Sequence, residues 1–473
     1  MKAKILIISL LFILTNIAVG QNSDLKKLLK SATKGDMEAQ FELAKHYFDG
    51  NDVEQNCNKA LEWYQKAADQ GHAKALYKLG LMYEKGDCVL KNLNKAVEWY
   101  QKAADKGHAK AQSKMAFFFT IGQGVIQDYK KAAEYYQMSA NQGEVGAYCG
   151  LGICYERGNG GPQDSRKAFE WYEKAANKGN AHGQFSLGIC YNNGIGVSRN
   201  YEKAIEWYEK AANNGHKDAQ YNLAYCYYNG IGVEQNVAKT IELMQNNANE
   251  GHLFSQVFLG DYYRGISNYK SAFEWYQKAA DQGNSYAQFR VGFFYFFGVG
   301  VEKNDKIAVE WYIKAAEQGN ADAQLQLGNA YYLGYGVVKD IHKSAEWSEK
   351  AANQGNVTAQ ELMAEKYYRG DGVEKNYDKC VEWSLKAANQ GHLSSQIFLG
   401  AFLLTQGKFS DAFYWLYKTA NQGVASSQCT LGYCYLQGMG TNQDYNMAIE
   451  WFKKAAAQGD EDAIRKLKEL KVK

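Results

Sequence analysis

Proline is almost absent from this chain, since Pro162 is the only one among 473 residues. Because proline ends or kinks helices and often marks linkers, its scarcity leaves no visible boundary that would divide the chain into separate domains. Long apolar runs are also missing after residue 20, and a membrane-spanning helix requires roughly 20 apolar residues. We therefore expect one elongated domain, with no membrane span once a leader segment has been removed.

An excess of charge of either sign is missing as well. The sequence has 54 lysines and arginines against 51 aspartates and glutamates, which gives a formal net charge of +3. The charges form no long run. This balance argues against a nucleic acid or an anionic membrane surface as the partner.

Motifs that carry chemistry are lacking too. We find no nucleophile elbow, phosphate loop, dinucleotide fingerprint, His-x-x-x-His or Cys-x-x-Cys. The pattern Ser-x-x-Lys, the acylating pair of penicillin-recognising enzymes, occurs at Ser31–Lys34 and Ser267–Lys270. Such a short pattern is expected by chance, and neither Ser-Asp-Asn nor Lys-Thr-Gly accompanies it. We expect no catalytic residue, no metal and no cofactor.

Residues 1–20 have the pattern of a secretory signal peptide. Lys2 and Lys4 precede an apolar run from Ile5 to Leu14, and small residues from Ala18 to Gly20 provide a cleavage site before Gln21. An uncleaved anchor is the alternative, but the apolar run is shorter than the roughly 20 residues of a span. This segment predicts a periplasmic or extracellular protein.

The abundant features recur with a single period. Each of the ten tryptophans occupies the same point of a repeating unit. A marker glycine recurs with the same period, and ten of its twelve intervals are 36 residues while two are 32. The marker glycines are Gly35, Gly71, Gly107, Gly143, Gly179, Gly215, Gly251, Gly283, Gly319, Gly355, Gly391, Gly423 and Gly459. Self-similarity at this period predicts a stacked solenoid, an architecture that holds partners.

Each unit reads as a pair of helices. Counted from the marker glycine, the fourth residue is small, the eighth is Leu, Met or Val, and the twelfth is usually aromatic, so these positions share one face of a first helix. A glycine-rich turn follows, and then a second helix such as Lys95–Ala104. We expect a signal peptide at 1–20, a capping helix at 21–35, twelve repeats at 36–459 and a second capping helix at 460–473.

The motifs Leu-Gly-x-x-Tyr (Leu79–Tyr83), Gly-x-Gly-Val (Gly122–Val125) and Lys-Ala-x-Glu-Trp-Tyr-x-Lys-Ala-Ala-x-Gln-Gly (Lys59–Gly71) resemble the Sel-one-like repeat family. That family is related to tetratricopeptide repeats, and the resemblance covers residues 25–470. It implies an all-α fold, a right-handed superhelical solenoid of antiparallel helix pairs. It also implies adaptor roles without a shared catalytic centre.

The first helices carry more apolar surface than one core face requires. We predict that this excess forms a partner-binding site, because aromatic anchors in a concave groove are typical hot spots for a peptide or protein. The alternative is that these residues pack against the neighbouring repeat. The candidate residues are Phe289, Phe293, Phe296, Phe297, Tyr332, Tyr225, Tyr228 and Tyr368.

Two polar columns also recur. A glutamine occupies the fifth position in ten units, and a histidine directly follows five marker glycines. The glutamines are either an amide ladder for an extended ligand or, as we favour, partners of backbone groups at turns. We expect the histidines to make polar contacts at helix starts, because a metal would need ligands a whole repeat apart.

The nine cysteines do not form the regular disulfide framework of an exported repeat protein. Cys154, Cys190, Cys226 and Cys434 share one helix position, where neighbours lie too far apart for a bridge. Only the pair Cys57 and Cys88, near loops of adjacent units, is geometrically plausible, and we expect even these two to remain unbridged. The cysteine-rich branch of the resembled family, linked to penicillin hydrolysis, uses one disulfide per repeat, which this chain lacks.

The sequence thus predicts an exported, monomeric, non-enzymatic scaffold or adaptor that binds a protein or peptide along its concave face. One alternative is a hydrolase of cell-wall amides or β-lactams. Another is a purely structural component of the cell envelope.

Overall fold

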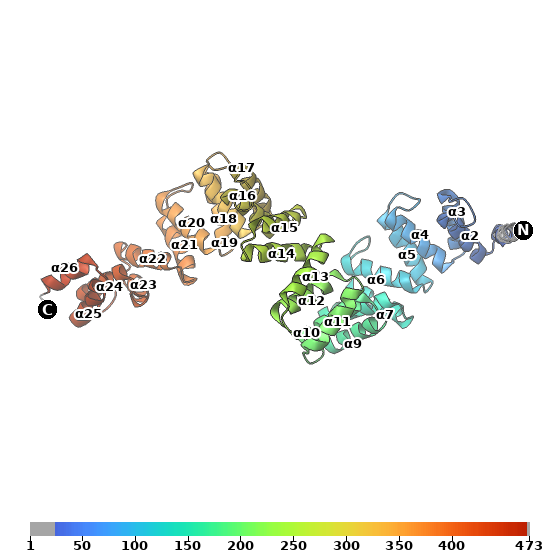
Figure 1. The fold of residues 1–473 in the computed structure, drawn as a ribbon, viewed down its shortest axis with the longest axis horizontal. Coiled ribbons are helices and arrows are strands. Elements are labelled where there is room, and N and C mark those ends of the chain that lie inside the picture. Colours follow the sequence, from blue (N-terminus) through green and yellow to red (C-terminus); the bar gives the residue numbers. More distant parts are fainter. Residues whose placement is uncertain (1–23, 471–473) are drawn as a thin grey trace, which may run out of the picture. The chain divides into compact units, whose positions relative to one another are not determined.

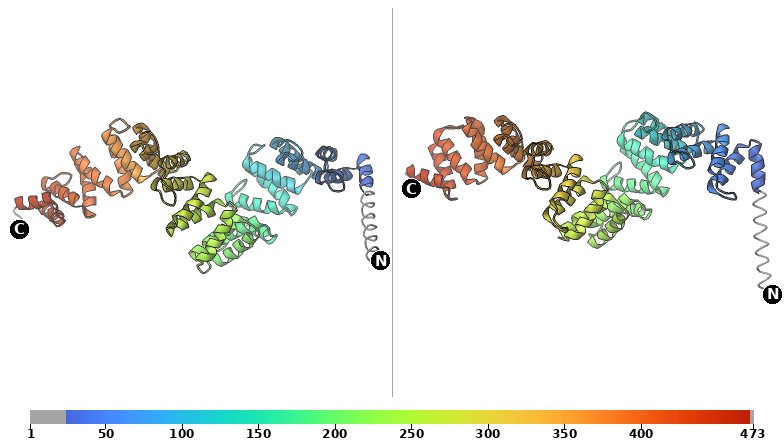
Figure 2. Two further views of the ribbon diagram at one scale, coloured as in Figure 1. Left: turned by 45° about the horizontal axis from the view of Figure 1, so that its top comes forward. Right: turned by 90° about the horizontal axis from the view of Figure 1, so that it is seen from above.

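The computed structural model describes residues 24–470, and the predicted signal peptide at residues 1–20 lies outside this range. Within it the protein consists of α-helices and contains no strand. The chain falls into two compact units, the first ending at Asn247 and the second beginning at Ala248. In each unit, successive helix pairs lie side by side (Figures 1 and 2). The expected all-helical fold of repeated helix pairs is confirmed.

The first unit opens with helical residues 24–33. Its further helices are α2 (Met37–Asp49), α3 (Cys57–Asp69), α4 (Ala73–Lys85), α5 (Leu93–Asp105), α6 (Ala109–Ile121), α7 (Tyr129–Asn141), α8 (Val145–Arg157), α9 (Ser165–Asn177), α10 (Ala181–Asn193), α11 (Tyr201–Asn213) and α12 (Lys217–Asn229). Helix α13 (Val237–Asn249) contains the unit boundary.

The second unit continues the pattern, with even-numbered helices as first helices and odd-numbered helices as second helices. Its helices are α14 (Leu253–Gly265), α15 (Tyr269–Asp281), α16 (Ser285–Phe297), α17 (Asp305–Glu317), α18 (Ala321–Leu333), α19 (Ile341–Asn353), α20 (Val357–Arg369), α21 (Tyr377–Asn389), α22 (Leu393–Thr405), α23 (Phe409–Asn421), α24 (Ala425–Gln437), α25 (Tyr445–Ala456) and α26 (Glu461–Glu469).

The residue after each marker glycine is the N-cap of a first helix. In α6, the Nδ1 atom of His108 accepts a hydrogen bond from the backbone N–H of Ala111 at 3.2 Å. Asn284 makes the same contact for α16 through its side-chain oxygen. Such a cap satisfies one of the free N–H groups at a helix start. The expected role of the histidine column at helix starts is therefore confirmed.

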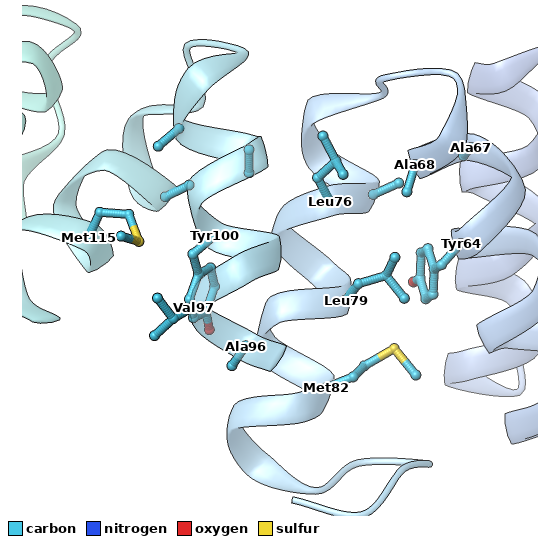
Figure 3. Close-up of a cluster of buried hydrophobic side chains, with 14 of the residues drawn as sticks. Tyr64, Ala67, Ala68, Leu76, Leu79, Met82, Ala96, Val97, Tyr100 and Met115 are labelled. Atoms are coloured by element: carbon cyan, nitrogen blue, oxygen red, sulfur yellow. The ribbon is translucent and has the colours of Figure 1, made fainter. Parts of the chain in front are cut away.

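The core lies between the paired helices and consists largely of alanines and leucines from first helices against tyrosines from second helices. The tyrosine of the Glu-Trp-Tyr motif is fully buried in six units, at Tyr64, Tyr100, Tyr172, Tyr208, Tyr276 and Tyr312. In the first unit, Leu79 of α4 points toward the ring of Tyr64 on α3 (Figure 3). Interdigitation of this kind ties each first helix to the second helices before and after it.

The glutamine column is part of the interior hydrogen-bond network. Gln324 is buried, and its Nε2 atom donates to the backbone carbonyl of Ala316 at 3.0 Å. Its Oε1 atom accepts a hydrogen bond from Nε2 of Gln354, at the end of the second helix of the same repeat, at 2.7 Å. Equivalent pairs of bonds occur at Gln288 and Gln360. The structural interpretation of these amides is confirmed, because their hydrogen-bonding capacity is used within the stack.

The tryptophan column carries a second repeated contact. Three residues after each tryptophan, a lysine places its ammonium group over the indole ring, as Lys314 does at 3.9 Å from the centroid of Trp311. The contact recurs at all ten tryptophans, with distances from 3.8 Å to 5.1 Å. The rings are half-buried in seven units and buried at Trp383, Trp415 and Trp451, and each lysine stem covers its ring while the charge stays in solvent.

The expectation that all the cysteines are unbridged is wrong for one pair. Cys57 and Cys88 form a disulfide with their Cα atoms 5.1 Å apart. Cys88 has φ +61° and occupies the place of the second glycine of Gly-x-Gly-Val. In other units that glycine packs on the first residue of the preceding second helix, as Gly160 does on Tyr129. Cys57 is the first residue of α3, so the repeat itself brings the two thiols together.

Candidate partner-binding site

Aromatic residues at the sixth position after the marker glycine lie on the first helices and mainly join neighbouring repeats. Tyr77 stacks on the capping histidine His108 of the next unit with ring centroids 4.6 Å apart, and Phe185 stacks on His216 at 4.4 Å. Phe289 occupies the same position, is only 7 % exposed and lies 6.0 Å from the ring of Tyr312. Of the candidate residues, Phe289 therefore supports the surface from beneath and offers little area to a partner.

Three other candidates lie together at the C-terminal end of α16. Phe297 is 55 % exposed, and its ring lies 4.4 Å from that of Phe293 and 4.9 Å from that of Phe296. Phe296 also contacts Tyr335, after α18, at 4.7 Å. Leu333, the last residue of α18, is 67 % exposed. We call Phe293, Phe296, Phe297, Leu333 and Tyr335 the phenylalanine patch.

One member of the same run of aromatic residues faces inward. Phe294 is 2 % exposed and packs against Tyr276 at 5.8 Å. The helical period therefore places the residues of the run Phe293–Phe297 on different sides of α16, and they cannot all face the same surface. The gathering of Phe293, Phe296 and Phe297 on one exposed side is the part of the predicted site that the fold brings together.

Tyr332 makes a separate set of polar contacts. Its hydroxyl donates to Oδ2 of Asp371 at 3.4 Å, and the ammonium group of Lys366 lies 4.6 Å from its ring centroid. Among the described residues, no ring contact joins Tyr332 to the three phenylalanines. Lys366 is buried and donates to Oγ of Ser344 at 2.9 Å. Burial lowers the pKa of Lys366, but Ser344 is equally buried, so this serine and lysine pair has no access for a substrate.

Tyr368, 42 % exposed on α20, belongs to a second aromatic group. Its ring lies 5.9 Å from Phe398, 6.0 Å from Phe402 and 5.7 Å from Tyr377. We call Tyr368, Tyr377, Phe398 and Phe402 the aromatic box. The sequence interpretation missed its last three members. The length of the repeat could have indicated them. Phe398 and Phe402 lie in a repeat of 32 residues, whose shortened turn leaves out part of the loop that covers the neighbouring helices in other repeats.

Beside the aromatic box, a groove of about 410 Å³ runs between α20 and α22 over α21. Its lining includes the carboxylates of Glu361 and Glu365, the guanidinium of Arg369 and two ring faces. The lining residues are Glu361, Ala364, Glu365, Tyr368, Arg369, Ser384, Ser394, Ser395 and Phe398. Arg369 is bound to Glu365 at 2.6 Å, while Nε2 of His392 lies 3.6 Å from Glu361.

Tyr225 and Tyr228 lie on α12 in the first unit, so the eight candidates do not form one site within either unit. Tyr225 is 46 % exposed and lines a groove of about 310 Å³ between α10 and α12. This groove is lined by rings and amides without a charged side chain. Its lining residues are Asn192, Tyr208, Tyr221, Asn222, Tyr225, Cys226 and Ile231.

Two cysteines on the helices beside this groove, Cys190 on α10 and Cys226 on α12, have buried thiols. Burial raises the pKa of the Cys190 thiol to about 12 and that of Cys226 to about 11, which keeps both protonated and weakly nucleophilic at neutral pH. In residues 24–470 no group of three or more His, Cys, Asp or Glu side chains is placed to hold a metal ion. None of the described helices is long and apolar enough to cross a membrane.

Comparisons with known proteins agree with this picture. A family model described as Sel1 repeat matches residues 38–72, 73–108, 109–144, 145–180, 181–216, 217–252, 253–284, 285–320, 321–356, 357–392, 394–424 and 425–460. The chain is similar to c5321, described as a protective antigen of uropathogenic Escherichia coli strains with an SLR fold. The identity is 35 %, the TM-score is 0.60, and the match covers 95 % of this chain and 91 % of that one.

A second similar structure is a Sel1 repeat protein from Oxalobacter formigenes, 34 % identical. The match covers 50 % of this chain and 98 % of that one, with a TM-score of 0.45. No curated protein matches the chain at the significance required.

Proposed function

Because the chain belongs to the Sel1 repeat family, we propose that it is an exported scaffold that holds a protein partner against the exposed aromatic residues of its first helices. The general part of this statement, a repeat scaffold, follows from the family and the fold. The binding surface and the compartment are our proposal, and each has its own support.

The phenylalanine patch is the observation that carries the binding proposal. Phe297 and Leu333 occupy equivalent positions at the ends of two successive first helices and remain more than half exposed, while Phe289 and Phe294 of α16 are buried. Phe296 and Tyr335 pack beside these exposed side chains. An exposed apolar patch of this kind lowers the solubility of a protein unless a partner covers it. Aromatic anchors on a rigid helical surface supply binding energy with little loss of conformational entropy.

Two observations support export. The disulfide between Cys57 and Cys88 is of a kind that persists in oxidising compartments. The relative with 35 % identity is described as a protective antigen, and an antibody must reach the antigen that it recognises. These observations agree with the signal peptide predicted at residues 1–20.

Affinity capture with mass spectrometry tests the binding surface. The baits are the chain from residue 21, the variant Phe297→Ala/Leu333→Ala and the control variant Leu90→Ala/Ile126→Ala. The control removes two apolar side chains that are each 91 % exposed in loops of the other unit. We expect a partner that the parent and the control recover and the patch variant loses, with all three equally helical by circular dichroism. Equal recovery by all three baits would reject the patch as the binding surface.

A cell-fractionation experiment tests export. The full chain is expressed with a C-terminal tag in a bacterium, and a thiol-blocking reagent is added before lysis. We expect the mature protein outside the cytoplasm, shortened by the leader and with Cys57 and Cys88 unavailable to the reagent. A full-length cytoplasmic protein with both thiols modified would contradict the proposal.

A further inference from the structure

The aromatic box beside the groove lies where one repeat is short. In repeats of 36 residues, a loop after the first helix packs its second glycine on the start of the preceding second helix, as Gly372 does on Ile341. The repeat that contains α22 lacks this loop, since α22 ends at Thr405 and α23 begins at Phe409. The start of α21 therefore faces the ring of Phe402, which lies 5.6 Å from Tyr377.

The exposed ring of Tyr368 and the half-buried rings of Phe398 and Phe402 form two walls at nearly a right angle. Phe398 and Phe402 are stacked at 5.2 Å with an interplanar angle of 12°. Tyr368 meets them edge-on, with interplanar angles of 87° and 81°. Ring faces at this angle present negative potential from two directions, which attracts an organic cation.

The charges of the lining favour the same occupant. Glu361 and Glu365 lie one turn apart on α20, and both carboxylates line the groove. Arg369 pairs with Glu365, which leaves Glu361 opposed only by the imidazole of His392. The residues that line the groove carry two negative charges and one positive charge. Lys366 on the same helix points away, toward Ser344, and does not line the groove.

From these observations we propose that the groove between α20 and α22 binds an arginine or lysine side chain of a protein partner, with the aliphatic stem against Tyr368 and Phe398 and the cationic head at Glu361. The inference rests on the proposed scaffold function and adds the chemistry that the scaffold recognises. The groove volume of about 410 Å³ accommodates such a side chain together with adjoining main chain. The hydroxyl of the exposed Ser394 provides a further hydrogen-bonding group along it.

Selection from a random peptide library tests the proposal. Twelve-residue peptides displayed on phage are selected on the immobilised chain from residue 21, and enriched peptides are synthesised for fluorescence anisotropy. We expect enriched peptides to share one arginine or lysine. Replacement of that arginine by citrulline, or of that lysine by norleucine, should weaken binding about tenfold, because the neutral side chain loses its attraction to the carboxylate of Glu361.

Matched variants locate the contact. We expect Glu361→Gln/Glu365→Gln and, separately, Tyr368→Leu to weaken the same peptides about tenfold, while Glu310→Gln/Glu346→Gln, which removes two exposed carboxylates elsewhere in the unit, leaves affinity unchanged. Enrichment of acidic or wholly apolar peptides, no enrichment, or affinities that both groove variants preserve would each overturn the proposal. Binding of phosphocholine without basic peptides would also overturn it, by reassigning the box to a small cation.

The outcome is separable from that of the proposed function. One result would be that basic peptides bind the groove and the patch variant recovers the captured partners as well as the parent does. That result would reject the phenylalanine patch as a binding surface and support the groove. Peptides whose affinity falls only for the variant Phe297→Ala/Leu333→Ala would reject the groove and support the patch.

Discussion

The ring of Tyr100 on α5 lies directly against the Cα atom of Gly80 on α4. A Cβ atom at Gly80 would lie 2.6 Å from two carbons of that ring, closer than van der Waals contact allows. The pair recurs in other repeats, at Gly188 with Tyr208 and at Gly260 with Tyr276. The small residue at the ninth position thus sets how closely the two helices of a unit approach each other, because a buried tyrosine fills the space that a side chain would need.

We expect Gly80→Ala to destabilise the protein although alanine favours helices over glycine. Overpacking a core costs about 1–3 kcal/mol, which exceeds the helix-propensity gain of roughly 1 kcal/mol. The control is Gly146→Ala in the first turn of α8, where the nearest atoms lie at 3.7 Å and 3.9 Å and leave room for a methyl group. Urea denaturation followed by tryptophan fluorescence should show a lower midpoint for the first variant only, and equal midpoints would contradict the steric account.

Gln324→Ala should destabilise the second unit by about 1–3 kcal/mol. The substitution removes two hydrogen bonds, one to the carbonyl of Ala316 and one from the side chain of Gln354, and each such bond contributes about 0.5–1.5 kcal/mol. The control is Gln437→Ala at the end of α24, which removes an exposed glutamine outside this network, and we expect a smaller effect there. Hydrogen exchange at the start of α18 reports the difference, and identical exchange in the two variants would argue against a structural ladder.

Acid should weaken the cap made by His108. Burial, followed by the charges of Lys110 and Lys74, lowers the pKa of His108 in the folded protein below its ordinary value of about 6.5. The unfolded chain therefore takes up the proton at a higher pH than the folded chain does. The free energy of unfolding should fall as pH drops through about 6.5 and level off below the folded pKa.

The substitution His108→Asn tests this assignment. Asparagine caps the equivalent helix starts at Asn284 and Asn320 without titrating in this range. Denaturation midpoints between pH 7.5 and pH 5 should decline less in the variant than in the parent. A parallel decline in both would assign the pH dependence to other groups.

Removal of the disulfide should loosen the N-terminal repeats. The bond joins residues 31 apart, and a crosslink over a loop of this size stabilises a protein by about 2–4 kcal/mol. In Cys57→Ser/Cys88→Gly, glycine restores the residue that other repeats use at φ near +70°, so the variant isolates the covalent bond from the backbone conformation. We expect faster hydrogen exchange in α3 and α4, and no further change when a reducing agent is added. Unchanged exchange in the variant would show that the bond adds nothing to stability.

Much of the fold could be predicted because each residue preference recurs at the same position of many repeats. The marker glycines, the small fourth residue and the Glu-Trp-Tyr motif gave the helix pairs, and the family comparison supports them. The histidine caps and the glutamine network were also predictable, since a polar residue that recurs in most units serves the contact between units. The disulfide was missed because the cysteines were weighed by their nearness to loops, whereas Cys88 had to be compared with the glycines of its column.

The candidate site was less predictable. Phe289 and Phe293 are four residues apart on α16, yet the first is buried against Tyr312 and the second belongs to the exposed patch. Tyr368 was found, but Phe398, Phe402 and the carboxylate of Glu361 were not, because they come from α20 and α22, which belong to different repeats.

The sequence by itself determined the helices and their order. Its caps, turns and core residues recur at fixed positions of one period, and stacked helix pairs account for that period. The tertiary structure decided which repeated aromatic residue is buried and which faces solvent. Helical period assigns a residue to a side of its own helix, but its exposure depends on how much of that side the neighbouring helices and turns cover. At Tyr368, that covering is reduced because the next repeat is four residues short.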